Sequence, residues 1–89
     1  MDVHVFVFEH RHGRDITVHA SAGAAYASAA AIARRDWAEA RQRVVTLPES
    51  PPLDDVKAVE MYFAAQEGEE SHEIAACPVE GVPAAAVIL

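Results

Sequence analysis

The sequence predicts an α+β fold in which a three-stranded antiparallel sheet carries two helices on one face. Three observations support this fold. Two segments rich in β-branched and aromatic residues open the chain and are separated by a short turn. Two segments with apolar residues at every third or fourth position follow, and another strand-like segment comes after them. The predicted order is therefore strand, strand, helix, helix, strand, within one compact domain over residues 1–89.

The first two strands are predicted over residues 3–8 and 15–20. Gly13 lies between them and can supply the positive φ that a tight turn requires. Two registers are open, because the loop can contain two residues (His12 and Gly13) or three. The expected cross-strand partners are Val7–Val18 and Phe6–His19 in the first case, and Phe8–Val18 and Phe6–Ala20 in the second. The second register is favoured because it gathers the aromatic residues and Ile16 on one face.

The first helix is predicted over residues 22–42, with Ser21 as its N-cap. Its buried stripe repeats at spacings of three and four residues. The stripe consists of Tyr26, Ala29, Ala33, Trp37 and Ala40. The alanines allow a close approach to the sheet, and Trp37 is expected to be the main core anchor.

A proline-rich segment at residues 48–52 ends regular structure before the second helix. This helix is expected to be capped by Ser50 or by the Asp54–Asp55 pair, and to run to about Gln66. Gly68 lies just past its end. Its buried stripe is predicted to be Leu53, Val56, Val59 and Phe63. A third strand at residues 71–77 is stopped by Pro78.

The predicted helices can cover only one face of the sheet, although the first strand is apolar on both sides. We therefore expect a homodimer, or another partner, on the uncovered face. In the competing arrangement the uncharged, apolar tail at residues 81–89 covers that face within the same chain.

Composition favours a cytoplasmic protein. Cys77 is the only cysteine, which suits a reducing compartment better than a disulfide-built secreted scaffold. The first apolar run is interrupted by His4, Glu9 and His10, so it does not resemble a signal peptide. No stretch approaches the roughly 18 apolar residues of a membrane helix, so no membrane partner is expected.

Charge is divided unevenly along the chain. Residues 1–43 carry a net charge of +1 and residues 44–89 carry −8, which accounts for the net charge of −7. Direct binding of nucleic acid is not expected, because phosphates would be repelled. Ordinary solubility explains surplus acid, but the functional interpretation is a surface that binds a basic protein. The predicted partner-binding residues are Glu49, Asp54, Asp55, Glu60, Glu67, Glu69, Glu70 and Glu73.

Catalytic and cofactor signatures are weak, so no catalytic residue, metal or cofactor is predicted. The alternative is a metal-binding or enzymatic hairpin, in which His10, His12 and Asp15 supply two imidazoles and a carboxylate. Gly13 argues against it by placing His12 in the turn. Cys77 has His72 in the same predicted strand, but its apolar neighbours favour a small core residue over a nucleophile. The paired carboxylates Asp54–Asp55 and Glu69–Glu70 are adjacent in sequence and do not face each other.

The hairpin sequence His10-Arg11-His12-Gly13, with Asp15 following and an alanine-rich helix containing Trp37 after it, resembles small uncharacterised proteins of phages and high-GC bacteria. This resemblance covers about the first half of the chain. It implies a compact α+β domain and a mobile-element context, and it brings no catalytic residues. In size and acidity the chain is also similar to anti-CRISPR proteins in general type.

Together these observations predict a non-enzymatic protein-interaction domain. Its most concrete form is a phage-type inhibitor whose acidic face blocks a nucleic-acid-binding surface on a host defence complex. The other hypotheses are the metal-binding or enzymatic hairpin and an accessory subunit with a housekeeping role.

Overall fold

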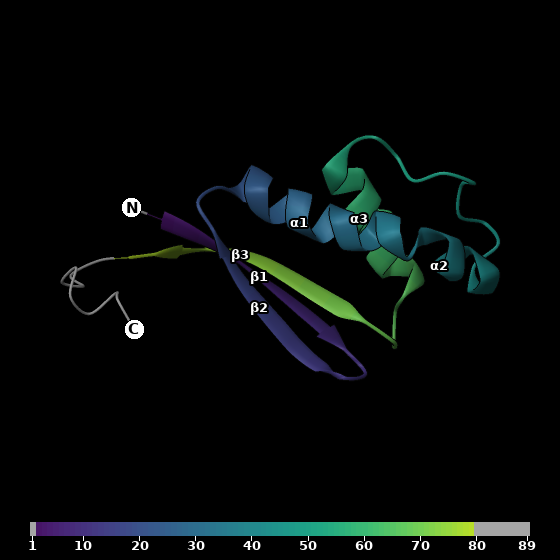
Figure 1. Cartoon of the computed structure of the whole chain (residues 1–89), viewed down its shortest axis with the longest axis horizontal. Helices are drawn as coiled ribbons and strands as arrows, with labels where there is room; N and C mark the ends of the chain where they lie inside the picture. Colours follow the sequence, from purple (N-terminus) through teal and green to yellow (C-terminus); the bar gives the residue numbers. More distant parts are fainter. Residues whose placement is uncertain (1, 80–89) are drawn as a thin grey trace.

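The computed structural model describes residues 2–79, and this part of the chain confirms the predicted α+β fold. The strands pair antiparallel in the order β2-β1-β3, and the helices are inserted between β2 and β3 (Figure 1). The elements are β1 (Asp2–His10), β2 (Gly13–His19), α1 (Ala22–Arg35), α2 (Trp37–Arg43), α3 (Asp55–Ala65) and β3 (Ser71–Pro78).

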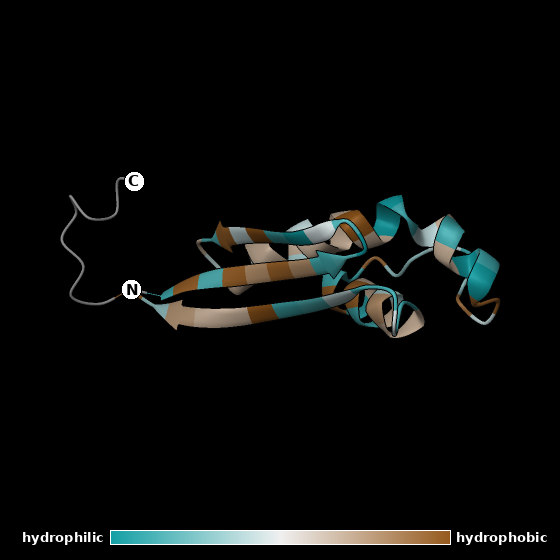
Figure 2. Cartoon of the chain, turned by 90° about the horizontal axis from the view of Figure 1, so that it is seen from below, coloured by the Kyte–Doolittle hydropathy of each residue, from teal (hydrophilic) through white to brown (hydrophobic). Residues whose placement is uncertain are grey.

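Helices α1 and α3 lie on one face of the sheet, and Figure 2 looks onto the strands from the opposite side. The covered side is the inner face, where Phe6 and Phe8 of β1 are buried against Phe63 of α3. Four alanines of α1 are completely buried, so this helix packs closely against α3 and the sheet. They are Ala25, Ala29, Ala30 and Ala33. Because so much of the core is alanine, the few large side chains supply most of the buried apolar area.

Both registers considered for the first hairpin are wrong, because the turn consists of Arg11 and His12. The observed partners are Val5–Val18, Phe6–Thr17, Val7–Ile16 and Phe8–Asp15. The His10 ring explains why the turn begins one residue before the predicted position. Its Nδ1 accepts a hydrogen bond from the His12 backbone N–H at 3.2 Å, and its Nε2 lies 2.9 Å from Asp15 Oδ2. Gly13 does have the expected positive φ, at +140°, directly after the turn.

The first helical segment is divided in two rather than continuous over residues 22–42. Ser21 caps α1 as predicted, by accepting a hydrogen bond from the Ala24 N–H at 3.1 Å. At Asp36 the backbone leaves helical geometry (φ −104°, ψ 10°), and α2 begins at Trp37. Trp37 is only 2% exposed, which confirms it as a core residue, and its indole N–H donates to the Pro48 carbonyl at 2.8 Å.

In the next helix the predicted stripe is partly wrong. Asp54 is the N-cap, since its side chain accepts from the Lys57 N–H at 2.9 Å, so Leu53 precedes the helix and is 98% exposed. Val56 is also exposed. Val59 and Phe63 are buried as expected, and the stripe is completed by Ala58 and Tyr62. Gln66 ends α3, and Gly68 follows with φ +87°.

The outer face of the sheet, opposite the helices, carries the other side chains of each strand. From β1 these are Val3, Val5 and Val7; from β2, Ile16 and Val18; from β3, Ala75 and Cys77. None of them is buried, so Cys77 is not the core residue that the sequence predicted.

The apolar tail at residues 81–89 lies outside the described residues. Within residues 2–79, no helix is long and apolar enough to cross a membrane.

Candidate protein-binding site

The eight acidic residues predicted to bind a partner divide into three groups in the structure. Asp54 and Asp55 stabilise the fold at the start of α3: Asp54 caps the helix, and Asp55 pairs with Arg34 at 2.8 Å. Glu49 is exposed in the loop before this helix, and Glu73 projects on the outer face opposite Val7. The remaining four lie on α3 or in the turn that joins it to β3. These are Glu60, Glu67, Glu69 and Glu70.

Three of these carboxylates surround a shallow hollow of about 410 Å³ between α3 and β3. Glu60, Glu67 and Glu70 line it together with the aromatic rings of Phe63 and His72. We call this site the acidic hollow. None of the described residues that line it is Lys or Arg. Its carboxylates are therefore available to a cation from another molecule.

The aromatic wall of the acidic hollow is a stacked pair of rings. Phe63 and His72 have ring centroids 4.3 Å apart and an interplanar angle of 25°. Burial lowers the pKa of His72, and the nearby Glu60 carboxylate only partly opposes this effect. The imidazole is therefore neutral at pH 7, and it adds an apolar surface to the hollow rather than a repelling positive charge.

Glu70 joins the acidic hollow to the hydrophobic core. Its Oε1 accepts a hydrogen bond of 2.8 Å from the Tyr62 hydroxyl, whose ring is buried. Burial, reinforced by the Glu70 carboxylate, raises the pKa of Tyr62, so the phenol remains protonated and acts as a donor. Tyr62 lines the larger groove described next and not the acidic hollow, so this contact fixes the Glu70 carboxylate at the boundary between the two.

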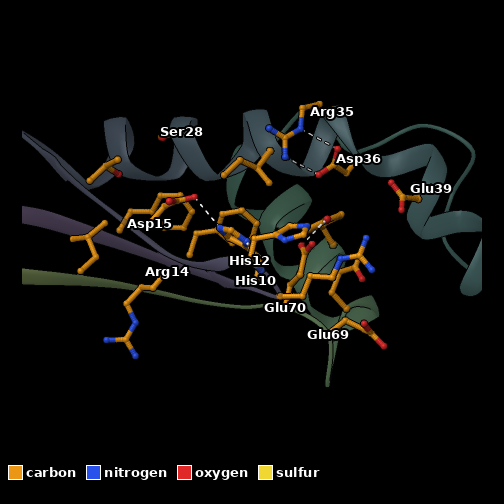
Figure 3. Close-up of a pocket in the computed structure, with 18 of the residues that line it drawn as sticks. His10, His12, Arg14, Asp15, Ser28, Arg35, Asp36, Glu39, Glu69 and Glu70 are labelled. Atoms are coloured by element: carbon orange, nitrogen blue, oxygen red, sulfur yellow. Dashed lines mark hydrogen bonds and ion pairs between the residues drawn. The ribbon is translucent and has the colours of Figure 1, made fainter.

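A larger groove of about 860 Å³ lies on the other side of Glu70, between the β1–β2 hairpin and helices α1 and α2 (Figure 3). Its charged side chains are mostly paired with one another. Arg35 binds both oxygens of Asp36, at 2.9 and 2.8 Å, and this contact lowers the pKa of the Asp36 carboxyl. Arg43 donates to Gln66 and lies 4.0 Å from Glu69. The groove is thus lined by internal ion pairs, whereas the acidic hollow is not.

The histidine hairpin borders this groove, and its geometry fits a structural role. The backbone N–H of His12 can only donate, so Nδ1 of His10 accepts and the proton lies on Nε2, which donates to Asp15. Both nitrogens of His10 are therefore occupied within the chain (Figure 3). Among residues 2–79, no group of three or more His, Cys, Asp or Glu side chains is placed to hold a metal ion.

Sequence reasoning identified the acidic residues of the hollow but not its aromatic wall. Phe63 was predicted only as a core residue, and His72 only as part of the third strand. Their contact depends on how α3 crosses β3, and no local pattern in the sequence reports that crossing.

In comparisons with known proteins, no family model, no curated protein and no solved structure matches this chain. Functional conclusions therefore depend on the geometry of the chain itself.

Proposed function

We propose that this protein is a non-enzymatic binding domain that docks on a basic protein surface and receives an arginine or lysine side chain in the acidic hollow. The observation that carries the proposal is the combination of three carboxylates with an aromatic wall in one hollow whose described lining has no Lys or Arg. Acidic side chains alone would fit ordinary solubility. Phe63 is buried beneath the wall, and the half-buried His72 ring adds an aromatic surface on which a long cationic side chain can pack.

The chemistry of the hollow suits a guanidinium group in particular. A guanidinium binds carboxylates through two parallel hydrogen bonds and stacks on flat rings. Glu60 and Glu67 supply carboxylates from α3 and the turn after it, and Glu70, held by Tyr62, adds negative charge at the edge of the hollow. The net charge of −8 in residues 44–89 would also accelerate the encounter with a basic surface at low salt.

The proposal is tested with a fluorescently labelled hexa-arginine peptide, followed by anisotropy at low and moderate salt. The variant replaces Glu60, Glu67 and Glu70 by Gln, which removes three charges while the amide oxygen at position 70 still accepts from Tyr62. We expect affinity to fall by about tenfold or more, because charged contacts at a hollow contribute more than those on an open surface.

A matched control replaces Asp2 by Asn and both Glu39 and Glu49 by Gln. These three residues are exposed and lie outside the acidic hollow, and the change in net charge is the same. We expect this control to lose only about two- to threefold in affinity, through weaker long-range attraction. Equal losses in the two triple variants would contradict the proposal, since general acidity would then account for binding.

The inhibitor form of this proposal, in which the carboxylates take the place of nucleic-acid phosphates, adds one requirement. The protein and a DNA duplex must exclude each other from the partner's surface at matched salt. A partner that holds both at once would contradict the inhibitor form and leave the binding of a basic surface intact.

A further inference from the structure

We propose that two copies of this chain associate through the free edges of their β2 strands, so that their sheets join into one continuous antiparallel sheet. This inference does not depend on the acidic hollow, which lies beside β3 at the opposite side of the sheet. It identifies the occupant of the β2 edge as a second copy.

Strand β2 is the most exposed strand of the sheet. Among residues 2–79 it has a neighbour on one side only, and all of its residues except His19 are exposed. Ile16 and Val18 are 58% and 62% exposed, whereas Val5 and Val7, on the same outer face of the central strand, are half-buried. In an antiparallel strand, every second residue directs its N–H and C=O away from the existing neighbour. The edge of β2 therefore offers both backbone hydrogen bonds and unburied β-branched side chains.

The two edges of the sheet differ in how they are protected against pairing. Strand β3 ends at Pro78 and carries Glu73 in its middle, and both features discourage an additional strand. Strand β2 contains no proline, and its two charged residues, Arg14 and Asp15, lie at the hairpin end, where Glu9 and His10 of the same chain pair with them. Its centre is the β-branched run Ile16-Thr17-Val18. Figure 2 shows β2 as an outer strand of the sheet, with its outer face toward the viewer. The edge of β2 is therefore less protected against pairing with another strand than the edge of β3.

The sequence of β2 is complementary to itself in one antiparallel register. A two-fold axis at Thr17 places the two Thr17 residues opposite each other and Ile16 opposite Val18 of the second copy. It also places Asp15 opposite the second copy's His19. Asp15 Oδ2 is bonded to His10 and His19 Nε2 to Thr17, so the atoms left for a contact between the copies are Asp15 Oδ1 and His19 Nδ1. An axis at Ile16 instead sets Arg14 against Val18 and loses the Asp15–His19 pair. A shift of the register by one residue would place inner-face residues of one strand opposite outer-face residues of the other. The Ile16–Val18 contacts and the Asp15–His19 hydrogen bond therefore select the axis at Thr17.

This register leads to a direct cross-linking experiment. In a Cys77→Ser background, Thr17→Cys places two cysteines directly opposite each other, within reach of a disulfide. Ile16→Cys is the matched control, because its two copies lie diagonally apart in this register. Under mild oxidation we expect a covalent dimer for Thr17→Cys and at least tenfold less for Ile16→Cys. A dimer formed face to face through the outer faces would favour the Ile16 link, because Thr17 lies on the inner face, and this outcome would overturn the proposal.

Mass measurement of the unmodified chain completes the test. We expect light scattering to show a dimer whose melting temperature rises with protein concentration. Val18→Lys should shift the mass to that of a monomer, because a charged side chain at the edge would stand opposite the apolar Ile16 of the second copy. Leu53→Lys makes the same chemical change at a 98% exposed residue far from the strand, and it should leave the dimer intact. A monomeric mass for the unmodified chain at about 1 mM would overturn the proposal, as would a dimer that survives Val18→Lys.

Discussion

The two faces of the sheet differ in surroundings far more than in composition. Along β1, Phe6 and Phe8 point to the inner face and are 2% and 7% exposed, while Val5 and Val7 between and beside them are half-buried on the outer face. One strand therefore supplies apolar residues in both directions, although helices cover only one of them (Figure 1). Within residues 2–79, the apolar residues of the inner face stabilise the fold under the helices, whereas those of the outer face have no described helix above them.

Polar side chains confirm this division. The charges of the outer face are confined to its hairpin end, where Arg14 pairs with Glu9 at 2.6 Å, and to Glu73 on the neighbouring strand. Polar residues on the inner face make specific contacts within the chain, such as those of His10 with Asp15 and of His72 with Phe63. An antiparallel sheet with one solvated face normally alternates apolar and polar residues. The outer face departs from that pattern over most of its length.

Phe8→Ala should produce the largest effect on stability. Phe8 lies against Phe63 with ring centroids 5.9 Å apart, at an angle of 72°, and also contacts the His10 ring. Truncation would leave a cavity in a small, alanine-rich core, so we expect a loss of about 3–5 kcal/mol in the free energy of unfolding. Urea denaturation followed by Trp37 fluorescence measures this loss. A loss below about 1 kcal/mol would contradict the assignment of Phe8 to the core.

Val7→Ala, one position away on the outer face, should cost much less. Val7 is half-buried by neighbouring strands and has no described layer above it, so we expect a loss of about 1 kcal/mol or less. The same urea experiment, at low protein concentration, provides the comparison with Phe8→Ala. A loss of about 3 kcal/mol would show instead that something covers the outer face in the isolated protein.

Local patterns in the sequence were sufficient to predict most of the fold. The order of elements, the Ser21 cap, the burial of Trp37 and the end of α3 near Gln66 all follow from periodicity and capping residues. The hairpin register did not, because it depends on the contact of the His10 ring with the turn and with Asp15. The exposure of Leu53 was missed because Asp54, rather than Ser50, caps the helix, which places Leu53 outside it.

The candidate site could be predicted only in part, because it is assembled from two elements. A charge count along the chain finds Glu60, Glu67 and Glu70 but also includes Asp54 and Asp55, which are used in capping and in the pair with Arg34. Distinguishing available carboxylates from occupied ones requires the positions of the arginines in three dimensions. The stacking of His72 on Phe63 likewise depends on tertiary packing.

The smallest expected effect concerns His72, the histidine that faces the acidic hollow from the inner side of the sheet. Burial lowers its pKa in the folded protein, whereas in the unfolded chain the imidazole titrates near its ordinary value of about 6.5. As the pH falls through that value, the unfolded state therefore binds more protons than the folded state. Stability contributed by the neutral ring is present above about pH 7 and is lost on acidification towards pH 5. The loss should be at most about 1 kcal/mol, because the ring is only half-buried.

Urea denaturation at pH 7.5, 6 and 5 measures this dependence, and His72→Gln is the control in which its contribution disappears. The lowered pKa of Asp36 does not interfere, since its stabilisation is lost only below about pH 4. The lowered pKa of His72 means that the native ring is protonated at a lower pH than the ring of the unfolded chain. That protonation would place a positive charge in the wall of the acidic hollow, so binding of the hexa-arginine peptide should weaken at the acidic end of this range. Loss of peptide binding in the native protein, with unchanged binding in His72→Gln, would connect the stacked ring to the hollow. An identical pH profile in both proteins would assign the change to other groups.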